Sequence, residues 1–452
     1  MSIKTGVRCI TYILLSLTLC AGLAADKLSD LVVPIDWTRF KDAIQSSEYT
    51  LSSKLVANGA RYSFNWAENY YEISPDGSHY LIENVNKEQP IRTPSSAAMG
   101  LAVAIKTKVD ETSIGASYKD LTKCAIQLVK GVVMHHKANG GKWGDHWQST
   151  MWAAQAGRAG WMLWESLDDE TKEMICKMVI YEADRHIKPS YQIKYWNGEG
   201  GNSRAEENSW DSMPLQLAIA MMPSHPNVQA WKNISSKLLV SAYSIKNDMN
   251  RKKPKIDGKS PSEWLDGYNV REDGIVINHG LLHNDYMSSI AHLQMSGFMV
   301  FSLANQIVPQ ALDFNFRLIY KTLVTKQFES PPYVEPGGTM YIAGSPEQYY
   351  PQGTDWSQYR YACYYGMDAL TDVLEYDKKL PKASNWVKLR GERILELQSR
   401  HEDGRMYKPG EYDNYWGKEQ MCFWMFADAH LLYWLADRNA LSKQKNWLKK
   451  QF

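Results

Sequence analysis

Apolar residues recur at three- and four-residue spacing along most of the chain, which is the pattern of amphipathic helices. From about Leu101 onward this spacing predicts a series of helices, and the alternating pattern of strands is nearly absent. The sequence therefore predicts an all-α fold. The predicted helices cover residues 118–134, 148–167, 170–186, 205–222, 227–249, 283–304, 312–325, 359–374, 382–398 and 418–436.

The breaks between these stretches carry Gly, Pro, Asn and Asp, the residues that end helices and form turns. Helices joined by such breaks lie antiparallel, and about ten to twelve of them in pairs predict a closed or incomplete α/α toroid. We expect this toroid to occupy residues 96–452 as one catalytic domain. Residues 26–95 have a less regular pattern, and we predict an irregular N-terminal segment that packs on the toroid.

The first segment of the chain, residues 1–25, has the order of a secretory signal peptide: Lys4 and Arg8, then an apolar run over residues 10–19, then small residues. We therefore expect a secreted or periplasmic protein. Cys20 occupies the position of a lipoprotein anchor, so a lipid-anchored surface protein is the alternative. The run is shorter than the roughly 20 apolar residues that span a bilayer, and no later stretch is apolar enough, so we predict no membrane span.

Composition favours a carbohydrate partner over a nucleic acid. The formal net charge of +1 gives no argument for nucleic-acid binding, and we expect none. The chain has 17 Trp and 27 Tyr against 10 Phe, and rings with a polar group suit both the apolar faces and the hydroxyl edges of sugars. Four later cysteines lack CxxC or metal-site spacing and form either one or two disulfides or four buried thiols: Cys124, Cys176, Cys363 and Cys422.

The densest polar cluster, residues 198–212, leads directly into a predicted helix. Asn208 and Asp211 lie three residues apart and share a helix face, with Glu207 and Trp210 close by. Such a segment can simply cap a helix, because acids at a helix N-terminus interact favourably with its dipole. A cap does not require two acids, an Asn and a Trp together, so we predict functional roles for these residues.

A second cluster, residues 266–290, combines histidines, amides and a tyrosine. His279, His283 and Tyr286 fall at i, i+4 and i+7, and a helix that begins near His279 would place them on one face beside Asn278. The two histidines have the spacing of helical zinc ligands, but Gly280 stands where the HExxH glutamate would be. We therefore predict a His/Tyr wall of an active site and no catalytic metal; a structural calcium or zinc stays open.

Two further segments, residues 141–149 and 341–362, carry aromatic and basic residues in predicted loops. Loop aromatics of this kind either form platforms for sugar rings or pack between adjacent helix pairs. We predict that they contact substrate. The residues concerned are Trp143 and His146 in the first segment, and Tyr350, Trp356, Tyr359 and Arg360 in the second.

These residue types match the needs of β-elimination next to a uronic acid. The reaction needs a group that neutralises the carboxylate, a base for the C5 proton and an acid for the leaving oxygen. We predict that Asn208, helped by protonated Glu207, binds the carboxylate. His279 and Tyr286 then handle the protons, and the sequence leaves open which is base and which is acid.

At Asn208, His279 and Tyr286 the chain resembles helical-toroid polysaccharide lyases, the hyaluronate, chondroitin and heparinase-like group. In that group an Asn-Trp-rich helix start precedes a DG segment with a His and then a Tyr; here NSWD and DGIVINHGLLHNDY stand in those places. Within this resemblance, the expected function is similar to that of a gut-bacterial type of lyase that releases rhamnose from glucuronate in plant arabinogalactan side chains. The resemblance implies an acidic polysaccharide or oligosaccharide substrate and no cofactor.

Two alternatives remain. An inverting glycoside hydrolase on the same scaffold needs two carboxylates about 6.5–9.5 Å apart, and Glu207 or Asp211 with Asp273 or Asp285 could supply them. A glycan-binding protein would use the aromatic platforms without an acid/base set. The His/Tyr cluster favours an enzyme.

Overall fold

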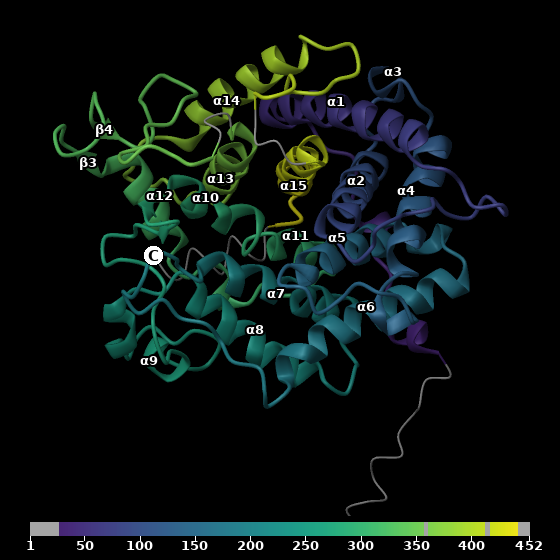
Figure 1. Ribbon diagram of the computed structural model, residues 1–452, viewed down its shortest axis with the longest axis horizontal. Coiled ribbons are helices and arrows are strands. Elements are labelled where there is room, and N and C mark those ends of the chain that lie inside the picture. The colour runs from purple at the N-terminus through teal and green to yellow at the C-terminus, as the bar shows by residue number, and fades with distance from the viewer. Residues whose placement is uncertain (1–26, 357–359, 412–415, 442–452) are drawn as a thin grey trace, which may run out of the picture.

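The computed structural model describes residues 27–356, 360–411 and 416–441, and this part of the chain is mostly helical (Figure 1). The predicted signal segment 1–25, with Cys20, and the predicted sugar contact Tyr359 lie outside the described residues. The α-helices are α1 (Ser47–Tyr70), α2 (Glu88–Lys106), α3 (Glu111–Ile114), α4 (Tyr118–Val133), α5 (Ser149–Met162), α6 (Asp169–Ile187), α7 (Ala205–Met221), α8 (Val228–Ala242), α9 (Pro261–Trp264), α10 (Asn284–His292), α11 (Gly297–Leu303), α12 (Phe316–Thr325), α13 (Tyr361–Val373), α14 (Ala383–Gln398) and α15 (Lys418–Asp437).

Strand structure in the described residues is confined to two short antiparallel hairpins and a few isolated bridges. One hairpin pairs β1 (Ile277–Asn278) with β2 (Leu281–Leu282), and the other pairs β3 (Gln327–Phe328) with β4 (Gly338–Thr339). The prediction of an all-α fold is confirmed at this level.

Side-chain caps start several helices where the sequence places Ser or Asp before an apolar repeat. The Ser46 hydroxyl accepts the backbone N–H of Tyr49 at 3.1 Å at the start of α1. The Asp168 carboxylate accepts the N–H of Thr171 at 2.6 Å at the start of α6. Each bond satisfies one of the N–H groups that the first turn of a helix leaves without a partner.

The prediction that residues 26–95 form an irregular segment is wrong for the middle and the end of that segment. Residues 47–70 form α1, the longest helix of the described chain, and α2 begins at Glu88. The last turns of α1 are rich in aromatic residues, and Trp66 stacks on Tyr70 one turn later with ring centroids 5.8 Å apart. No Gly or Pro interrupts the last turns of α1, so a helix that buries small residues forms despite the aromatic content.

Several predicted helices are shorter than expected or broken. The helix predicted over 283–304 divides into α10 and α11, and the residues between them, Leu293 to Ser296, are not helical. The helix predicted over 227–249 ends at Ala242, and a 3₁₀ turn follows. In both cases apolar residues continue past the helix end because the connection itself is buried, so periodicity alone could not locate the end.

The helices contact one another in a continuous circuit. Helix α15 contacts α2, α2 contacts α5, and α5 contacts α7; α7 contacts α10 and α11, α10 contacts α13, and α13 returns to α15. Other helices contact members of this circuit: α1 packs on α2 and α15, α4 on α2, α6 on α5 and α7, α8 on α7, and α14 on α13. Figure 1 shows α15 in the middle of the view, with α1, α2 and α13 around it. The first two long helices, α1 and α2, therefore pack directly on the last helix, α15.

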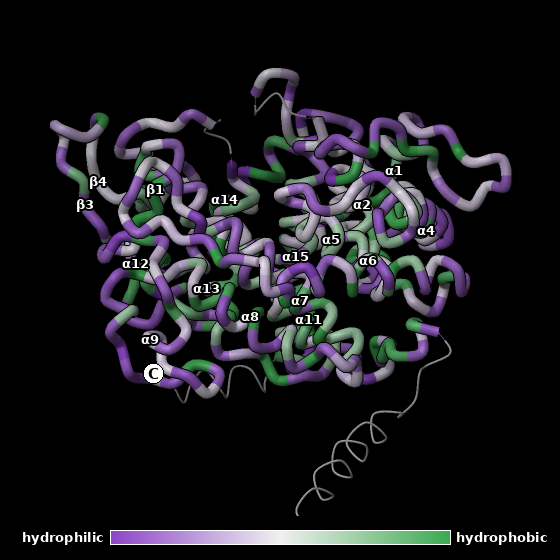
Figure 2. The backbone as a smooth tube through the Cα atoms, turned by 60° about the horizontal axis from the view of Figure 1, so that its bottom comes forward, coloured by the Kyte–Doolittle hydropathy of each residue, from purple (hydrophilic) through white to green (hydrophobic). Residues whose placement is uncertain are grey.

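The helices of the circuit carry the largest share of the core. Every residue of α5 and α7 is buried, whereas α14 on the outside exposes one side. Hydrophobic segments follow the interior helices, and the connecting loops are hydrophilic (Figure 2). All four cysteines of the described residues are buried thiols without a disulfide partner. Of the two predicted alternatives, the structure therefore has four buried thiols and not disulfides. No helix of the described residues has the length and apolarity needed to cross a bilayer.

Candidate active site

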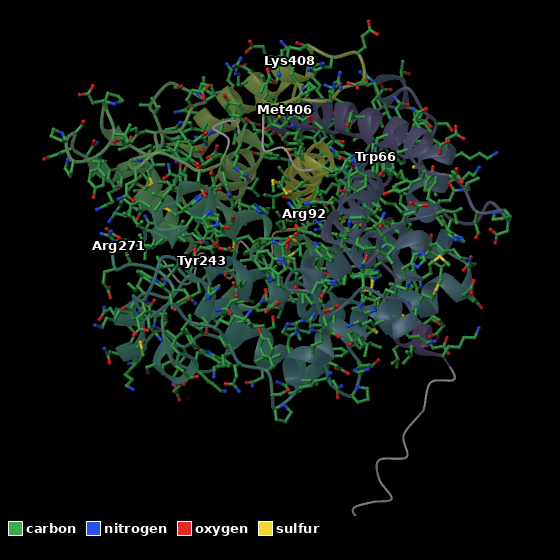
Figure 3. All side chains as sticks on the ribbon, in the orientation of Figure 1. Trp66, Arg92, Tyr243, Arg271, Met406 and Lys408 are labelled. Carbon is green, nitrogen blue, oxygen red and sulfur yellow. The ribbon has the colours of Figure 1, made fainter. Side chains whose placement is uncertain are left out.

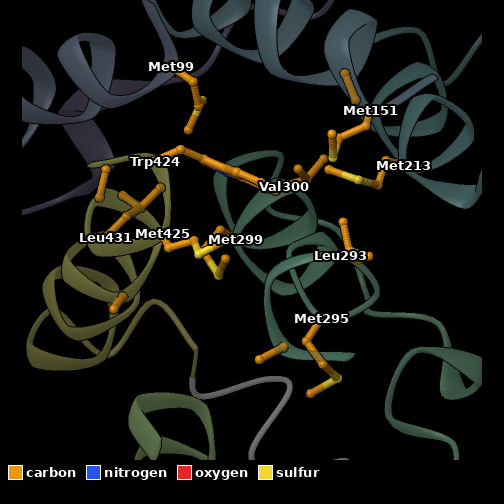
Figure 4. Packing of buried hydrophobic residues seen from close by; sticks show 14 of the residues in the cluster. Met99, Met151, Met213, Leu293, Met295, Met299, Val300, Trp424, Met425 and Leu431 are labelled. Carbon is orange, nitrogen blue, oxygen red and sulfur yellow. The ribbon is translucent and has the colours of Figure 1, made fainter. Parts of the chain in front are cut away.

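A cavity of about 390 Å³ opens between the start of α2, the loop before α5, helix α7, the β1–β2 hairpin, α10 and α15. Its floor is apolar and contains Met151, Leu293, Trp424 and Met425, which also belong to the packed core (Figure 4). Its walls carry the polar and aromatic residues described below. A concave, apolar-floored pocket with a few converging polar groups is the usual form of a small-molecule or sugar site.

The β1–β2 hairpin places His279 at the cavity. Ile277 pairs with Leu282 and Asn278 with Leu281, so His279 and Gly280 form a two-residue turn. Both residues have positive φ, 51° and 75°, as a type I′ turn requires. The backbone N–H of His279 donates to Asn202 Oδ1 at 2.9 Å, and that of Gly280 to Gly201 O at 2.9 Å, which fixes the turn against the loop before α7.

His279, His283 and Tyr286 come together, although not on one helix face as predicted. His283 is the N-cap of α10, and His279 precedes the helix. The ring centroid of Tyr286 lies 5.5 Å from that of His279 and 4.6 Å from that of His283. The three side chains are therefore close together, as predicted, but a hairpin turn and the start of α10 bring them together. The prediction of a helix that begins near His279 is wrong.

The Tyr286 hydroxyl lies between a histidine and a buried carboxyl. Its Oη is 3.3 Å from His279 Nε2, and it also hydrogen-bonds to Glu206. Burial, followed by the charge of Glu206, raises the pKa of Tyr286. Glu206 is 6% exposed, and burial, followed by the charge of Glu207, raises its pKa well above the usual range. Tyr286 thus keeps its proton at neutral pH, and the shift of Glu206 favours its protonated form.

Asp355 connects the two histidines. His279 Nδ1 is 2.7 Å from Asp355 Oδ2, and His283 Nε2 is 3.3 Å from Asp355 Oδ1. Desolvation opposes ionisation of Asp355, but the hydrogen bond and charge of His279 prevail and lower the pKa of this carboxyl. Burial lowers the pKa of His283 to about 4, so its imidazole is neutral near pH 7.

Behind His283 lies a second carboxyl, that of Asp285. His283 Nδ1 is 3.9 Å from Asp285 Oδ2, while Oδ1 accepts the hydroxyls of Tyr350 at 3.0 Å and Tyr364 at 2.8 Å. Burial raises the pKa of Asp285, and the charge of Arg360 acts in the opposite direction. Asp285 therefore supports the site from below rather than facing the cavity.

Three tryptophans and two arginines form the remaining walls. Trp147 is 55% exposed and contacts Trp210 edge to face, with ring centroids 4.9 Å apart. Trp356 packs on Tyr286 at 4.7 Å, and the Arg360 guanidinium lies 3.8 Å above the Trp356 ring. Arg92, near the centre of Figure 3, lines the same cavity and pairs with Glu88. The cavity thus combines flat rings with cationic groups.

Asn208 and Glu207 do not line the cavity, which corrects two of the four predicted catalytic residues. Asn208 is a fully buried residue of α7 and donates from Nδ2 to Lys194 O at 2.9 Å. Glu207 pairs with Lys194 at 2.9 Å and Arg204 at 2.7 Å. The side chains of neighbouring helix residues point about 100° apart, so Glu206 and Glu207 cannot face the same side of α7.

Of the predicted substrate contacts, Trp210, Trp356 and Arg360 line the cavity as expected. Trp143 does not: its indole is fully buried and donates to Val132 O at 2.9 Å, so it belongs to the core. His146 lies beside the cavity and not in its lining, with Nε2 3.2 Å from Asn86 O.

The other three described candidates lie behind the cavity surface. Tyr350 is buried on Asp285, as described above. His283 is 2% exposed and faces Asp355. Asn278 is 3% exposed and donates from Nδ2 to Glu206 Oε2 at 3.1 Å. These residues position the groups that do face the cavity.

Sequence reasoning missed Glu206, Asp355 and Arg92, whereas Trp147 lies in the loop segment 141–149 whose aromatic residues were predicted to contact sugar. Glu206 had one usable signal, because it is four residues before Trp210 and so shares its helix face. Asp355 had none, since it follows His279 by 76 residues and meets it only in the folded chain.

A larger cavity of about 1020 Å³ lies elsewhere, lined by residues from α8, α9, α11 and the loop after α11, such as Trp264, Phe301 and Ile307. It contains no histidine and no tyrosine. The smaller cavity is therefore the candidate active site, because its lining combines a histidine and a tyrosine in contact with several tryptophan rings.

Comparisons of the chain with protein-family models, curated proteins and solved structures find no match.

Proposed function

We propose that the protein is a secreted polysaccharide lyase that cleaves a glycosidic bond at C4 of a uronic acid by β-elimination. The observation that carries the proposal is the Tyr286 hydroxyl, which lies 3.3 Å from His279 Nε2 inside a cavity bordered by Trp147, Trp210 and Trp356. The helix circuit also supports an α/α toroid, because each member contacts the next and α13 returns to α15. An open end of such a ring is a natural place for a glycan cleft.

The Asp355, His279 and Tyr286 side chains form a chain that can move protons. When His279 Nδ1–H donates to Asp355 at 2.7 Å, the Nε2 lone pair faces the Tyr286 hydroxyl. In the first arrangement, Nε2 accepts the C5 proton, the C5 electron pair forms the C4=C5 double bond, and the C4–O bond breaks. Tyr286 donates its proton to the departing oxygen, and His279 returns a proton to Tyr286 across the 3.3 Å contact.

The reverse arrangement, with Tyr286 as base, has the same balance of atoms. Tyr286 first gives its own proton to His279 and then accepts the C5 proton. The leaving oxygen then takes a proton from Tyr286. The raised pKa of Tyr286 favours the first arrangement in the free enzyme, because the phenol stays protonated at neutral pH.

Substrate charge and shape fit the walls of the cavity. Arg92 and Arg360 can attract a uronate carboxylate, since a guanidinium offers two parallel N–H donors to its two oxygens. Protonated Glu206 can donate one further hydrogen bond and takes the role predicted for Glu207. Trp147 and Trp356 offer flat faces for sugar rings.

The test is incubation of the full-length mature protein with a panel of uronic-acid glycans, including rhamnosyl-glucuronate from plant arabinogalactan. Elimination creates a conjugated C4=C5 double bond, so near-ultraviolet absorbance should rise with the intact uronate. A substrate in which the uronate is reduced to a hexose should give no signal. Cleavage with a saturated product would instead identify a hydrolase.

The hydrolase alternative has less support from the geometry. Asp273 pairs with Arg271 at 3.0 Å and Lys326 at 3.2 Å, and Asp211 accepts the Tyr191 hydroxyl at 2.8 Å. Neither these two carboxylates nor those of Glu207 and Asp285 are in the cavity lining. A glycan-binding protein would not need the Asp355–His279–Tyr286 chain.

A further inference from the structure

We propose that His279, His283 and Asp355 form a binding site for one divalent transition-metal ion of the zinc type. One ligand atom from each side chain lies within 4.8 Å of the other two. The site stands on these three side chains and does not depend on the proposed lyase activity. It goes beyond the prediction from spacing, which gave no catalytic metal.

The two histidine nitrogens approach different oxygens of Asp355, and the ligand atoms lie within 4.8 Å of one another, so small adjustments would bring them to the separations around a small metal ion. A tetrahedral zinc ion bound at about 2.0–2.1 Å holds its ligand atoms roughly 3.3–3.4 Å apart. His283 Nε2 is 3.3 Å from Asp355 Oδ1, which already has this separation. His279 Nδ1 is 2.7 Å from Asp355 Oδ2, so this pair must open by a few tenths of an ångström. Asp355 is 45% exposed as a side chain and can make that adjustment.

The ligand types select the class of metal. Two imidazoles with one carboxylate suit zinc and its first-row neighbours, whereas calcium and magnesium prefer oxygen ligands throughout. A set of three protein ligands leaves a fourth position open, as catalytic zinc sites do. His279 lines the cavity, so the open position can face a ligand there.

The surroundings of His283 have the form of a metal-site support. Its Nε2 faces Asp355, while its Nδ1 has no hydrogen-bond partner and lies 3.9 Å from Asp285 Oδ2. Metal-bound histidines commonly direct their second nitrogen to a carboxylate, which fixes the ring orientation. Tyr350 and Tyr364 hold Asp285 in place for this role.

The backbone of His279 is also fixed in an uncommon conformation. Its φ of 51° is in the left-handed region, and its N–H is held by Asn202 Oδ1 at 2.9 Å. A non-glycine residue in this region has a conformational cost, and such residues concentrate at functional sites. Here the turn holds His279 beside Asp355, and the 36% exposure of the His279 side chain leaves a path for the ion.

The charge of such a site would also serve the proposed function. Two neutral imidazoles and one carboxylate around a divalent ion leave a net charge of about +1, which attracts a uronate carboxylate at the open position. With a metal on Nδ1, His279 would keep its proton on Nε2 and could only donate it toward Tyr286, so His279 would no longer accept a proton in either arrangement of the elimination. This consequence rests on the proposed function; the binding site does not.

The experiment measures metal binding directly on the untagged mature protein. After treatment with EDTA and removal of the chelator, the protein is titrated with Zn²⁺ by calorimetry, and with Co²⁺ by visible absorption. We expect one ion per chain, and Co²⁺ bands typical of a four- or five-coordinate site. His279→Ala and Asp355→Asn should each weaken Zn²⁺ binding by more than about tenfold, the loss that removal of even an outer partner causes.

Asp266→Asn is the matched control, because Asp266 is an exposed carboxylate that pairs with Lys237 away from the cavity. It should bind Zn²⁺ like the unaltered protein. Circular dichroism checks that both ligand variants fold, and both substitutions are at partly exposed side chains. Absence of Zn²⁺ binding, or binding that both ligand variants retain, overturns the metal site.

The two proposals can fail separately. Zn²⁺ binding without an unsaturated product from any uronate glycan leaves the metal site standing and removes the lyase. An unsaturated product formed at full rate by protein that binds no Zn²⁺ supports the lyase and overturns the metal site.

Discussion

At the scale of single residues, Tyr286 is the group whose removal tests the chemistry most directly. Tyr286→Phe removes only the hydroxyl that contacts His279 and Glu206. Loss of a proton-transfer group typically lowers turnover by about 10²–10⁴-fold, so we expect that decrease with substrate affinity largely kept. Tyr268→Phe, which removes a hydroxyl bonded to Asn197 O outside the cavity, should leave the rate of unsaturated product formation unchanged. Equal rates for both variants would remove Tyr286 from the reaction.

Glu206 gives a second prediction, on pH and stability. Its folded pKa lies well above the ordinary value near 4.5, so above that pH the unfolded chain releases a proton that the folded chain keeps. The stability contribution of Glu206 is therefore full below about pH 4.5 and falls as pH rises toward the folded pKa, by up to about 1.4 kcal/mol per pH unit. Glu206→Gln should remove this pH-dependent loss of stability.

Urea unfolding at pH 4 and pH 7 measures the effect. The unfolding free energy at pH 4 minus the unfolding free energy at pH 7 should be smaller in Glu206→Gln than in the unaltered protein. Glu207→Gln is the matched control, and it removes ion pairs with Lys194 and Arg204 instead. An unchanged pH dependence in Glu206→Gln would mean that this carboxyl ionises normally in the folded protein.

At the scale of elements, the β1–β2 hairpin depends on a turn that favours glycine. Gly280 has a φ of 75°, and a Cβ added there would meet no atom within 4 Å. Gly280→Ala thus tests backbone conformation alone and should lower the unfolding free energy by about 1–2 kcal/mol. Gly280→Asn should cost less, because Asn enters the left-handed region more readily. Denaturant unfolding measures both, and equal costs would contradict this account of the turn.

At the scale of the whole molecule, the N-terminal helices α1 and α2 pack on the C-terminal helix α15 through glycines. A Cβ at Gly100 of α2 would overlap the ring of Phe423 on α15. Gly100→Ala should therefore destabilise by about 1–3 kcal/mol from overpacking, although Ala in a helix would otherwise gain about 1 kcal/mol.

The effect should depend on the ring. In a Phe423→Leu background Gly100→Ala should cost less, and a double-mutant cycle in urea gives the coupling. If Gly100→Ala stabilises the protein in both backgrounds, the close contact between the two ends of the chain is misplaced.

Sequence alone determined the helical class and part of the site. Periodicity is a local property, and most predicted helices exist within a few residues of the expected bounds. The cluster of His279, His283 and Tyr286 was also found from the sequence, because eight consecutive residues cannot separate far whatever turn or helix they form. Even there the local structure differed, since Gly280 allowed a hairpin turn where a helix start was expected.

Only the tertiary structure decided which polar groups join this cluster. Every residue of α7 is buried, so its pattern has no polar side, and the sequence could not tell that Glu206 faces the cavity while Asn208 faces away. Asp355 reaches His279 across 76 residues, and Trp143 is taken into the core by packing between helices. Spacing along the chain fixes which side chains share a face of one element, whereas packing between elements fixes which face is covered and which is open.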